Sequence, residues 1–525
     1  MTGIKKINLI SAVLVSLSLC GGCTLEKAGN SSQDQTVQED NETEQVKAEK
    51  AEKEEINEIH LRDKDSLYEN DDDTSVVTMY LTVSKGNSSE NTYHTWKEIN
   101  SYSVYDYEDM GVERYQVAGL LQVGDENGPT QGEVGYGESV PNATVQIRGQ
   151  TSSQNAQKNY KIELKKNKGT WRGQRTINLN KHMTEGMRFR NKLAYDLIRG
   201  IPQMVGLRTQ FVHLYVKDNT EESGVKFEDY GIYTQVEQLN KTALKSHGLD
   251  SNGQLYKINS FEFYRYEDII KKEDDAGYDK TAFEKMLEIK GDSDHTKLID
   301  MLTDLNDYSI GIEDVLKEHF DEENIVYWMA FQILMGNVDT QNRNVYLYSP
   351  LNSDIWYFIA WDNDGCLMRP EYELRNFSDQ NSWEKGISNY WGNILFQRCL
   401  KSDAFREKLD QVIEELRRYL SEERLEEMVE QYAGVVQPYV EKMPDQLNEP
   451  LTPEEYEQVK AGLPKEVEQN YEMYRESLEK PMPFYIGRPV TENGKLKINW
   501  DASYDFDAED ITYSVEIARD YQFTQ

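Results

Sequence analysis

Three aspartates and one asparagine near the middle of the chain have side chains suited to binding a divalent metal ion. Asn344 stands five positions after Asp339, and Asp362 and Asp364 follow further along the chain. Their carboxylate and amide oxygens are hard ligands of the kind that Mg²⁺ or Mn²⁺ prefers, and these ions keep positions free for phosphate oxygens. The residue types therefore point to metal-assisted chemistry on phosphate groups.

The spacing of these residues matches an arrangement that transfers phosphoryl groups. In protein kinases, a catalytic aspartate is followed five positions later by a metal-binding asparagine and then by a second metal-binding aspartate. We therefore assign Asp339 as the catalytic base and Asn344, Asp362 and Asp364 as metal ligands. The usual HRD and DFG letters and a GxGxxG loop are absent from the sequence, and each residue taken singly could be an ordinary turn former.

A predicted β-hairpin would bring the four side chains together. Residues 345–348 and 356–361 are aromatic and aliphatic runs on either side of a polar turn, a pattern typical of two antiparallel strands. Asp339 and Asn344 precede the first strand, and the other two aspartates follow the second. Because these two ends are neighbours in an antiparallel pair, we expect the four side chains to converge.

Basic residues that could bind nucleotide phosphates flank a Gly/Ser-rich turn. Residues 143–147 and 158–164 predict two strands, with Arg148 at the end of the first and Lys158 and Lys161 in the second. A lysine beside such a turn can receive phosphate, although most lysines on the polar face of a strand simply face solvent. Which of the two lysines would contact phosphate stays open.

The surrounding patterns predict an α+β fold with two lobes. Alternating apolar runs indicate strands, and apolar residues at intervals of three and four indicate helices. Outside the runs already given, strands are expected at 76–83, 209–216 and 230–237, and helices at 189–198, 316–334 and 405–443. We expect an N-terminal lobe over about residues 76–240 and a mainly helical C-terminal lobe over residues 241–482.

Several sequence blocks, taken in order, resemble the CotH kinase family, the spore-coat protein H type of atypical protein kinase. They are Arg148-Gly149, Lys158…Tyr160-Lys161, Asn191-Lys192-Leu193-Ala194-Tyr195-Asp196-Leu197, Tyr230-Gly231-Ile232-Tyr233…Glu237, Leu255-Tyr256-Lys257, Gly336-Asn337-Val338-Asp339…Asn344-Val345-Tyr346-Leu347-Tyr348 and Trp361-Asp362-Asn363-Asp364. The resemblance implies a divergent, two-lobed protein-kinase-like fold. It also implies transfer of phosphate from ATP, with Mg²⁺ or Mn²⁺, to Ser or Thr of extracytoplasmic or coat-type proteins.

The resemblance also assigns roles to individual residues. Asp339 matches the family's catalytic aspartate, and Asp362 matches its metal-binding aspartate. Less directly, it places Arg148, Lys158 and Lys161 near the nucleotide phosphates. Glu237 would position a lysine or line the nucleotide pocket.

The charge of the chain limits its partners. Among 525 residues, 58 Lys and Arg oppose 94 Asp and Glu, which gives a formal net charge of −36. This charge excludes a general nucleic-acid binder, which needs a concentrated basic face, and it suits basic, Ser-rich protein substrates. Four Cys and seven His without the spacing of zinc sites exclude a common zinc fold. The spacing of Cys366 and Cys399 leaves open whether they pair.

The N-terminus is typical of an export signal. Two lysines precede an apolar run at 7–19, and small residues then lead to Cys23. This resembles a bacterial lipoprotein signal peptide over residues 1–22 with Cys23 as the lipidated residue, and an ordinary secretory signal is the alternative. Residues 23–75 are acidic and poor in aromatics, which predicts a disordered tether. We expect a protein anchored by lipid to the outer face of a bacterial cytoplasmic membrane, or secreted.

The C-terminus adds a short β-rich pattern. Residues 494–500 and 511–518 alternate in the manner of strands, and residues 483–525 resemble the first half of a fibronectin type III sandwich. A complete sandwich of this kind needs about 100 residues. We therefore favour a truncated domain over a segment that packs on the kinase-like lobes.

Two other classes of function fit the same residues. A non-catalytic surface lipoprotein could keep this fold for adhesion or substrate display, and a glycoside hydrolase could use two of the clustered carboxylates. The first alternative predicts that Asp339 and Asn344 are dispensable. The second predicts activity without ATP or a metal ion.

Overall fold

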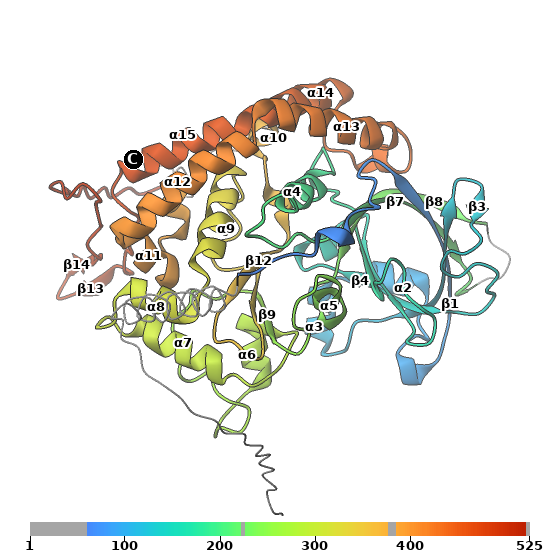
Figure 1. Ribbon diagram of the computed structural model, residues 1–525, viewed down its shortest axis with the longest axis horizontal. Helices are drawn as coiled ribbons and strands as arrows, with labels where there is room; N and C mark the ends of the chain where they lie inside the picture. The colour runs from blue at the N-terminus through green and yellow to red at the C-terminus, as the bar shows by residue number, and fades with distance from the viewer. Residues whose placement is uncertain (1–59, 222–225, 376–384, 521–525) are drawn as a thin grey trace, which may run out of the picture. The chain divides into compact units, whose positions relative to one another are not determined.

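The computed structural model describes residues 60–221, 226–375 and 385–520 (Figure 1). The expected signal peptide, Cys23 and residues 23–59 of the expected tether lie outside these ranges. Among the described helices, none combines the length and the apolar character needed to cross a bilayer.

The first part of the described chain is a large, closed sheet. Its strands are β1 (Val76–Ser84), β2 (Val117–Asp125), β3 (Gly128–Pro129), β4 (Ala143–Arg148), β5 (Asn159–Leu164), β6 (Thr176–Asn180), β7 (Thr209–Asp218) and β8 (Glu228–Glu237). They pair in the order β1-β7-β8-β6-β5-β4-β2-β3, and β1 also pairs with β2, so seven strands close into a ring. In β5, Tyr160, Ile162 and Leu164 are buried while Lys161 and Glu163 are not, as the alternation predicts.

Short helices accompany this sheet. They are α2 (Trp96–Ser101), α3 (Val104–Met110) and the 3₁₀ turns η1 (Asp65–Leu67), η2 (Ser88–Glu90) and η3 (Thr151–Gln154). The side chains of Thr95 and Ser103 accept backbone hydrogen bonds at the starts of α2 and α3, in capping boxes. The turn η3 lies within the Gly/Ser-rich connection between β4 and β5.

The second part combines a small antiparallel sheet with many helices. The strands β9 (Gln254–Ile258), β10 (Leu287–Ile289), β11 (Val345–Ser349) and β12 (Tyr357–Ala360) pair in the order β10-β9-β11-β12. The helices are α4 (Arg190–Ile198), α5 (Lys241–Ser246), α6 (Lys280–Met286), α7 (Thr296–Asn306), α8 (Ile312–His319), α9 (Glu322–Leu334), α10 (Arg369–Leu374), α11 (Ile394–Lys401), α12 (Asp403–Tyr419), α13 (Glu422–Val440), α14 (Pro453–Gly462) and α15 (Glu466–Leu478). The 3₁₀ turns are η4 (Asn363–Gly365), η6 (Gly386–Tyr390), η7 (Asp445–Asn448) and η8 (Leu463–Lys465). The expected α+β class is confirmed.

Two of the expected helices are each divided in two. The side chain of Asp321 accepts from the backbone of Asn324 and starts α9, and Ser421 accepts from Arg424 and starts α13. Each cap satisfies a backbone N–H that a new helix start leaves unpaired. The apolar periodicity continues across both breaks, so the pattern alone predicted single helices at 316–334 and 405–443.

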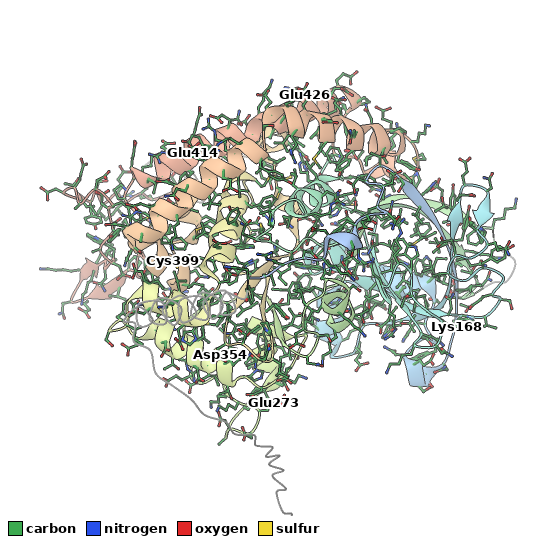
Figure 2. All side chains as sticks on the ribbon, viewed as in Figure 1. Lys168, Glu273, Asp354, Cys399, Glu414 and Glu426 are labelled. Carbon is green, nitrogen blue, oxygen red and sulfur yellow. The ribbon has the colours of Figure 1, made fainter. Side chains whose placement is uncertain are left out.

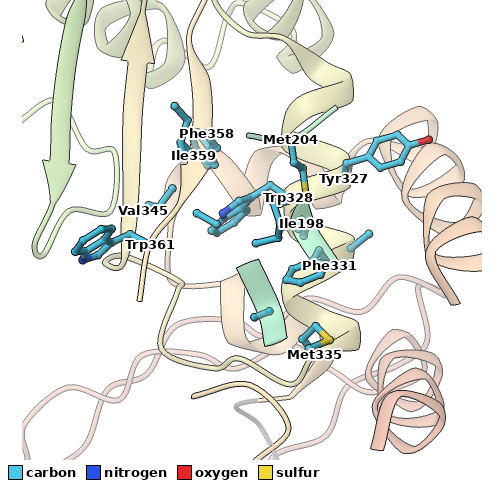
Figure 3. Packing of buried hydrophobic residues seen from close by; sticks show 14 of the residues in the cluster. Ile198, Met204, Tyr327, Trp328, Phe331, Met335, Val345, Phe358, Ile359 and Trp361 are labelled. Atoms are coloured by element: carbon cyan, nitrogen blue, oxygen red, sulfur yellow. The ribbon is translucent and has the colours of Figure 1, made fainter. Parts of the chain in front are cut away.

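Helix α9 lies within the core and ends directly before the predicted site. Figure 3 shows Trp328 and Phe331 of α9 among apolar side chains that include Phe358 of β12. The Trp328 ring lies 5.1 Å from the Phe358 ring and 5.6 Å from the Phe396 ring, centroid to centroid. Because α9 is apolar on all sides, burial is its stable location, and the polar loop that follows it starts from a fixed point.

Residues 60–75 pack against the rest of the chain, which corrects the expected tether. Leu61 is 4% exposed and belongs to the core. The Tyr68 hydroxyl donates to the carbonyl of Gly206 at 2.9 Å, and an Asp63 oxygen lies 2.6 Å from Nδ1 of His247. The acidic composition suggested a solvated spacer, but these residues have partners far along the chain. The expected end of the tether at residue 75 is therefore wrong.

The C-terminal segment also packs on the helical part. Residues 490–492 and 495–497 form a hairpin of β13 (Val490–Glu492) and β14 (Lys495–Lys497), whereas residues 511–518 form no strand. The expected second strand is therefore wrong. The Met482 N–H donates to the Tyr504 carbonyl at 2.7 Å, and the Tyr504 ring lies 5.3 Å from that of Trp391. The segment therefore packs on the helical part, and truncation of a longer domain stays a prediction.

The surface of the helical part carries many carboxylates, and its two cysteines lie inside. Figure 2 shows Glu273, Asp354 and Glu426 at its periphery, and all three are exposed. Cys366 and Cys399 are buried and free, and burial raises the pKa of both thiols far above the ordinary value. Cys366 and Cys399 therefore form no disulfide with each other in the described structure.

Candidate active site

The β11–β12 hairpin brings the two ends of the predicted site together. Val345 pairs with Ala360 at the end of the ladder, and the Trp361 N–H donates to the Asn344 carbonyl at 3.2 Å. Asn344 and Asp362 both have a φ of 56°, a left-handed conformation that non-glycine residues seldom adopt. Such local strain concentrates at functional sites, where the surrounding structure holds it.

Asp339 and Asn344 are in direct contact. The Asn344 amide nitrogen Nδ2 donates to Oδ2 of Asp339 at 3.0 Å, and Arg343 Nε lies 3.7 Å from the other carboxylate oxygen. Partial removal from water and the charge of Asp364 raise the pKa of Asp339, while Arg343 and Asn344 lower it; the net direction is upward. A carboxylate with a raised pKa is a stronger base than a free one.

The loop that carries Asp339 is fixed from several sides. The Thr340 hydroxyl donates to the carbonyl of Asn337 at 3.0 Å, and the Asn389 amide donates to the carbonyl of Val338, also at 3.0 Å. Gly336 has a φ of 65° and its missing Cβ would lie 2.7 Å from the Asn470 side chain. The backbone near Asp339 is thus set by glycine at the end of α9 and by hydrogen bonds on both sides.

Asp362 directly precedes the 3₁₀ turn η4, Asp364 lies within it, and the two carboxylates repel one another. Burial and then the charge of Asp364 raise the pKa of Asp362, and the positive groups Arg148, His182 and Lys257 oppose that rise. Nδ1 of His182 lies 3.6 Å from an Asp364 oxygen. Two carboxylates held close together, with a third nearby at Asp339, leave an excess of negative charge that a cation would neutralise.

Two basic residues face this carboxylate pair from different elements. The Arg148 guanidinium lies 6.0 Å from the Trp361 ring and donates to Asn180 of β6. The Lys257 ammonium lies 5.9 Å from the same ring. Burial lowers the pKa of Lys257, whereas Asp362 is among the groups that raise it. Arg148 is therefore placed beside the acidic turn, as expected, and Lys257 joins it.

Lys257 received no role from the sequence, although the block Leu255-Tyr256-Lys257 was part of the family resemblance. Its signal was a lone lysine in an otherwise buried strand, β9, opposite Tyr346 of β11. The pairing of β9 with β11 joins segments almost a hundred residues apart, so local spacing did not connect Lys257 with Asp362.

The other predicted nucleotide-binding residues occupy different positions. Lys158 is buried and donates to the carbonyl of Ser153 at 2.7 Å, so it holds the Gly/Ser-rich turn in place. Lys161 pairs with Glu163 at 2.9 Å and is about one-third exposed. Lys161 lies on the same face of the sheet as Arg148. The strands β4 and β5 are paired, and along each of them these residues alternate with buried ones. A contact of Lys161 with phosphate stays a prediction.

Of the two roles expected of Glu237, the positioning of Lys158 or Lys161 is not what the structure shows, and the lining of a nucleotide pocket stays a prediction. Glu237 is 1% exposed, contacts Arg208 at 2.5 Å and His247 at 2.9 Å, and neither partner is a predicted site residue. Those two groups outweigh burial and lower the pKa of Glu237 to about 2. Glu237 therefore joins β8 to the segment before β1 through His247 and Asp63, and it does not position Lys158 or Lys161.

Helix α4 holds the acidic turn from behind. The Tyr195 hydroxyl accepts the backbone N–H of Asp362 at 3.1 Å, and the Asn191 side chain accepts that of Asn363, also at 3.1 Å. Every residue of α4 is buried, its polar residues included. These contacts explain why polar side chains occupy a buried helix: they satisfy backbone groups that the left-handed turn leaves unpaired.

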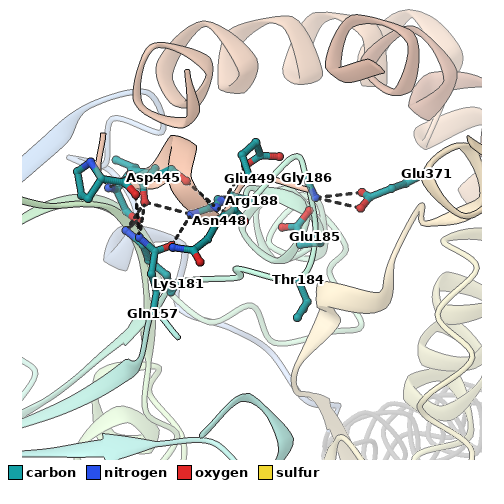
Figure 4. A network of polar contacts seen from close by, with 12 residues as sticks. Gln157, Lys181, Thr184, Glu185, Gly186, Arg188, Glu371, Asp445, Asn448 and Glu449 are labelled. Atoms are coloured by element: carbon teal, nitrogen blue, oxygen red, sulfur yellow. Dashed lines mark hydrogen bonds and ion pairs between the residues drawn. The ribbon is translucent and has the colours of Figure 1, made fainter. Parts of the chain in front are cut away.

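A buried ionic network fixes the segment between β6 and α4, which includes His182. Figure 4 shows Lys181 and Arg188 directed at Asp445, with nearest distances of 2.5 Å and 3.1 Å. Arg190, which is fully buried, lies 2.8 Å from Glu371 of α10. Removing one member of a buried ion pair leaves an uncompensated charge, so this segment is held firmly against η7 and α10.

The donor set suits a magnesium-type ion. Within the described ranges, no group of three or more His, Cys, Asp and Glu side chains is gathered closely enough to hold a metal alone. Mg²⁺, however, binds through one or two carboxylates and keeps water and phosphate oxygens. The mutual repulsion that raises the pKa of Asp362 is the charge pattern that a divalent cation relieves, and Asn344 supplies a neutral oxygen. The residues therefore fit such an ion together with a nucleotide.

Comparison with known proteins places this site in a family. The family model described as CotH kinase protein matches residues 145–474. The chain belongs to the CotH kinase family. The match includes every residue from Arg148 to Asp364 discussed above, and it ends before residues 475–525. Membership supports a kinase-like interpretation of the chain.

Individual relatives of this CotH kinase chain are distant. The inner spore coat protein H of Bacillus subtilis (strain 168) is 24% identical over 260 residues, which are 49% of this chain and 66% of that protein. The chain thus spans just under two thirds of the length of this relative. A crystal structure of the Helicobacter pylori proinflammatory kinase CtkA aligns with 61% of this chain and 94% of its own, at 11% identity and a TM-score of 0.27.

Proposed function

We propose that this CotH kinase chain transfers the γ-phosphoryl group of ATP to Ser or Thr hydroxyls of proteins outside the cytoplasm, such as coat proteins. The observation that carries the proposal is the convergence of Asp339 and Asn344 with Asp362 and Asp364 at one end of the β11–β12 hairpin, facing Arg148 and Lys257. The family match and the name of the spore coat relative support a kinase acting at a coat or cell surface.

Asp339 is the base of the proposed reaction. Its side chain is 57% exposed, so it is accessible to an acceptor hydroxyl. The acceptor oxygen forms a bond to the γ-phosphorus, the bond from that phosphorus to the bridging oxygen of ADP breaks, and the acceptor proton moves to a carboxylate oxygen of Asp339. The hydrogen bond from Asn344 orients the carboxylate for this step.

Asn344, Asp362 and Asp364 would hold Mg²⁺ or Mn²⁺. When bound, the ion neutralises and orients the phosphate oxygens of ATP. The chain's own residues prepare for this: Tyr195 fixes the backbone of Asp362, and His182 lies against Asp364.

Arg148 and Lys257 would bind the phosphates that are not transferred. They lie on separate strands, each about 6 Å from the Trp361 ring, and both interact with the charge of Asp362. Lys158 would act indirectly by holding the turn at Gly149–Ser153. Because the protein has a large net negative charge, a few basic side chains at the site must supply most of the electrostatic attraction for ATP.

The site supports the kinase over both alternatives, and one experiment separates the three. The chain from residue 24 onward is incubated with ATP labelled at the γ-phosphate and with Mg²⁺, alone and with a basic, Ser-rich protein. We expect labelled phosphoserine or phosphothreonine that disappears with a metal chelator. A non-catalytic adhesion protein would incorporate no label, and a glycosidase would release reducing sugar from oligosaccharides without ATP.

Location at the outer face of the membrane through lipid on Cys23 is part of the same proposal. It rests on the resemblance of residues 1–23 to a lipoprotein signal. Metabolic labelling with an alkyne fatty acid tests it: wild type should carry the label and the Cys23→Ser variant should not. Equal labelling of both would remove the lipid anchor.

A further inference from the structure

A cavity of about 590 Å³ opens beside Asp339, a size typical of binding pockets. Most of its walls come from three separate stretches: the loop after α9, the turn before α11, and the C-terminal segment after α15. Tyr264 and Gln397 complete the lining. Val338, Asp339 and Gln341 line it from the first stretch, and Ser388–Gly392 from the second, apart from Tyr390. The third wall, with Phe484, Tyr485 and Asp501, lies beyond the family match, which ends at residue 474.

Hydrogen bonds hold this third wall in shape. The Asp501 N–H donates to the Tyr485 carbonyl and the Gly487 N–H to the Asn499 carbonyl, both at 2.9 Å. The two arms of the segment thus pair in antiparallel fashion and lead to the β13–β14 hairpin, which lies at the left edge of the view in Figure 1.

Aromatic contacts anchor the base of this segment to the helical part. The rings of Tyr504 and Phe506 lie 5.3 Å and 5.8 Å from the Trp391 ring, and the Arg406 guanidinium lies 4.8 Å from the Phe506 ring. Trp391 itself lines the cavity. The wall is therefore attached at the cavity it borders, and it is not a loosely joined appendage.

The chemistry of the walls indicates what the cavity would bind. Tyr485 is 68% exposed and Phe484 is 38% exposed, so two aromatic rings are presented to solvent beside a reactive carboxylate. Exposed aromatic pairs of this kind mark interaction sites. The charged residues among the described lining are Asp339 and Asp501, and that lining includes no Lys, Arg or His. The two carboxylates disfavour an acidic ligand, most of all at Asp501, because Arg343 lies 3.7 Å from Asp339 and offsets part of its charge.

We propose that residues 483–502 form one wall of a groove that binds an extended segment of the acceptor protein on either side of its hydroxyl residue. Phe484 and Tyr485 pack on the apolar parts of that segment, and Asp501 selects against acidic residues beside the acceptor. This inference rests on the proposed function, because Asp339 in the same cavity fixes where the acceptor hydroxyl must lie.

Charge favours this occupant over two others. A second copy of the chain, with a formal net charge of −36, and the chain's own acidic residues 23–59 would both bring carboxylates against Asp339 and Asp501. Like charges juxtaposed in this way weaken binding. A neutral or basic acceptor segment meets no such repulsion.

The test compares the full mature chain with Tyr485→Ala and Asp501→Asn variants. Ile517→Ala is the matched control, since Ile517 is 73% exposed on the same C-terminal segment and does not line the cavity. The substrates are synthetic peptides with one central Ser, in which each flanking position is varied in turn. Initial rates with ATP and Mg²⁺ give KM and kcat for peptide and KM for ATP, and thermal unfolding verifies that each variant is folded.

We expect Tyr485→Ala to raise KM for peptides at least fivefold with a smaller change in kcat. Asp501→Asn should relax the discrimination against Asp and Glu beside the acceptor Ser, and Ile517→Ala should match wild type. If wild type transfers phosphate but both variants keep its peptide KM and its flanking preferences, this inference is overturned while the proposed function stands. Faster transfer by the variants would also overturn it, since the wall would then cover the site. No transfer by wild type to any acceptor would contradict the proposed function itself.

Discussion

The side-chain amide of Asn344 donates a hydrogen bond to the carboxylate of Asp339, with 3.0 Å between Nδ2 and Oδ2. The two residues stand five positions apart at the end of one polar loop, so a single turn brings the proposed base and a proposed metal ligand into contact. The contact links positioning of the base to the site that would hold the ion. It also predicts how the two functions respond to mutation.

Replacement of Asn344 by Ala should impair both functions. The variant loses a neutral ligand and the hydrogen bond that orients Asp339, so we expect kcat to fall by about 100-fold and half-maximal activity to need more Mg²⁺. Phosphate transfer measured over a range of Mg²⁺ concentrations provides both quantities. Asn352→Ala, at the opposite end of the same hairpin, is the control and should behave as wild type. An Asn344→Ala variant with unchanged Mg²⁺ dependence would remove Asn344 from the metal site.

Lys257 should contribute more to ATP binding than Lys161 does. Lys257 lies 5.9 Å from the Trp361 ring beside Asp362, whereas Lys161 pairs with Glu163 on the surface. We expect Lys257→Met to raise KM for ATP by about tenfold, equivalent to about 1.4 kcal/mol, and Lys161→Met to change it less than threefold. Initial rates of phosphate transfer over a range of ATP concentrations measure both KM values. The reverse order would place Lys161, as the sequence first suggested, at the phosphates.

Tyr195→Phe tests the support behind the acidic turn. The substitution removes the hydroxyl that accepts the Asp362 N–H at 3.1 Å and leaves that partly buried group unpaired, a loss of about 1 kcal/mol. We expect lower unfolding stability and about tenfold weaker activation by Mg²⁺. Tyr419→Phe is matched to it, because the Tyr419 hydroxyl also contacts α4, at the Leu197 carbonyl, but away from the turn. Equal Mg²⁺ activation in both variants would show that Tyr195 has only a general structural role.

His247 predicts how stability depends on pH. Burial alone lowers its pKa, but hydrogen bonds to Asp63 and Glu237 outweigh burial and raise the pKa to about 9. Because the folded value exceeds the unfolded value of about 6.5, protonated His247 stabilises the fold fully below pH 6.5, and that contribution disappears as the pH rises through 9. The free energy of unfolding should fall by up to about 3 kcal/mol over this interval.

Urea unfolding at several pH values between 6 and 9.5 measures this effect. His247→Gln should be less stable at pH 6 and should show a flatter pH dependence. His295→Gln is the control, since burial lowers the pKa of His295 and its titration lies below the interval. A wild-type stability that stays constant from pH 6.5 to 9 would contradict the interpretation of the Asp63–His247–Glu237 contacts.

Local patterns in the sequence predicted the elements around the site well. The hairpin of β11 and β12, strand β5 and helix α4 follow the expected ranges closely, because each has a strong apolar period and polar residues at its ends. The meeting of Asn344 with the residues after β12 followed from antiparallel pairing alone. These features depend on interactions between residues close in the sequence.

Features that depend on distant contacts were missed or misplaced. Lys257 joins the site only because β9 pairs with β11, and Glu237 does not position Lys158 or Lys161 because its partners are Arg208 and His247. Residues 60–75 have the composition of a spacer, yet Leu61 enters the core and Asp63 binds His247. In each case the deciding partner lies far away along the chain, where neither periodicity nor composition can indicate it.

The most direct test of the account is the Asp339→Asn variant with ATP. The substitution keeps the size of the side chain and its hydrogen bond with Asn344 but removes the base. Binding of ATP with Mg²⁺, measured by calorimetry, should stay within about threefold of wild type, while transfer of labelled phosphate to a protein acceptor should fall by at least 100-fold. Transfer by Asp339→Asn at the wild-type rate would contradict the assignment of Asp339 as the catalytic base and, with it, the proposed mechanism.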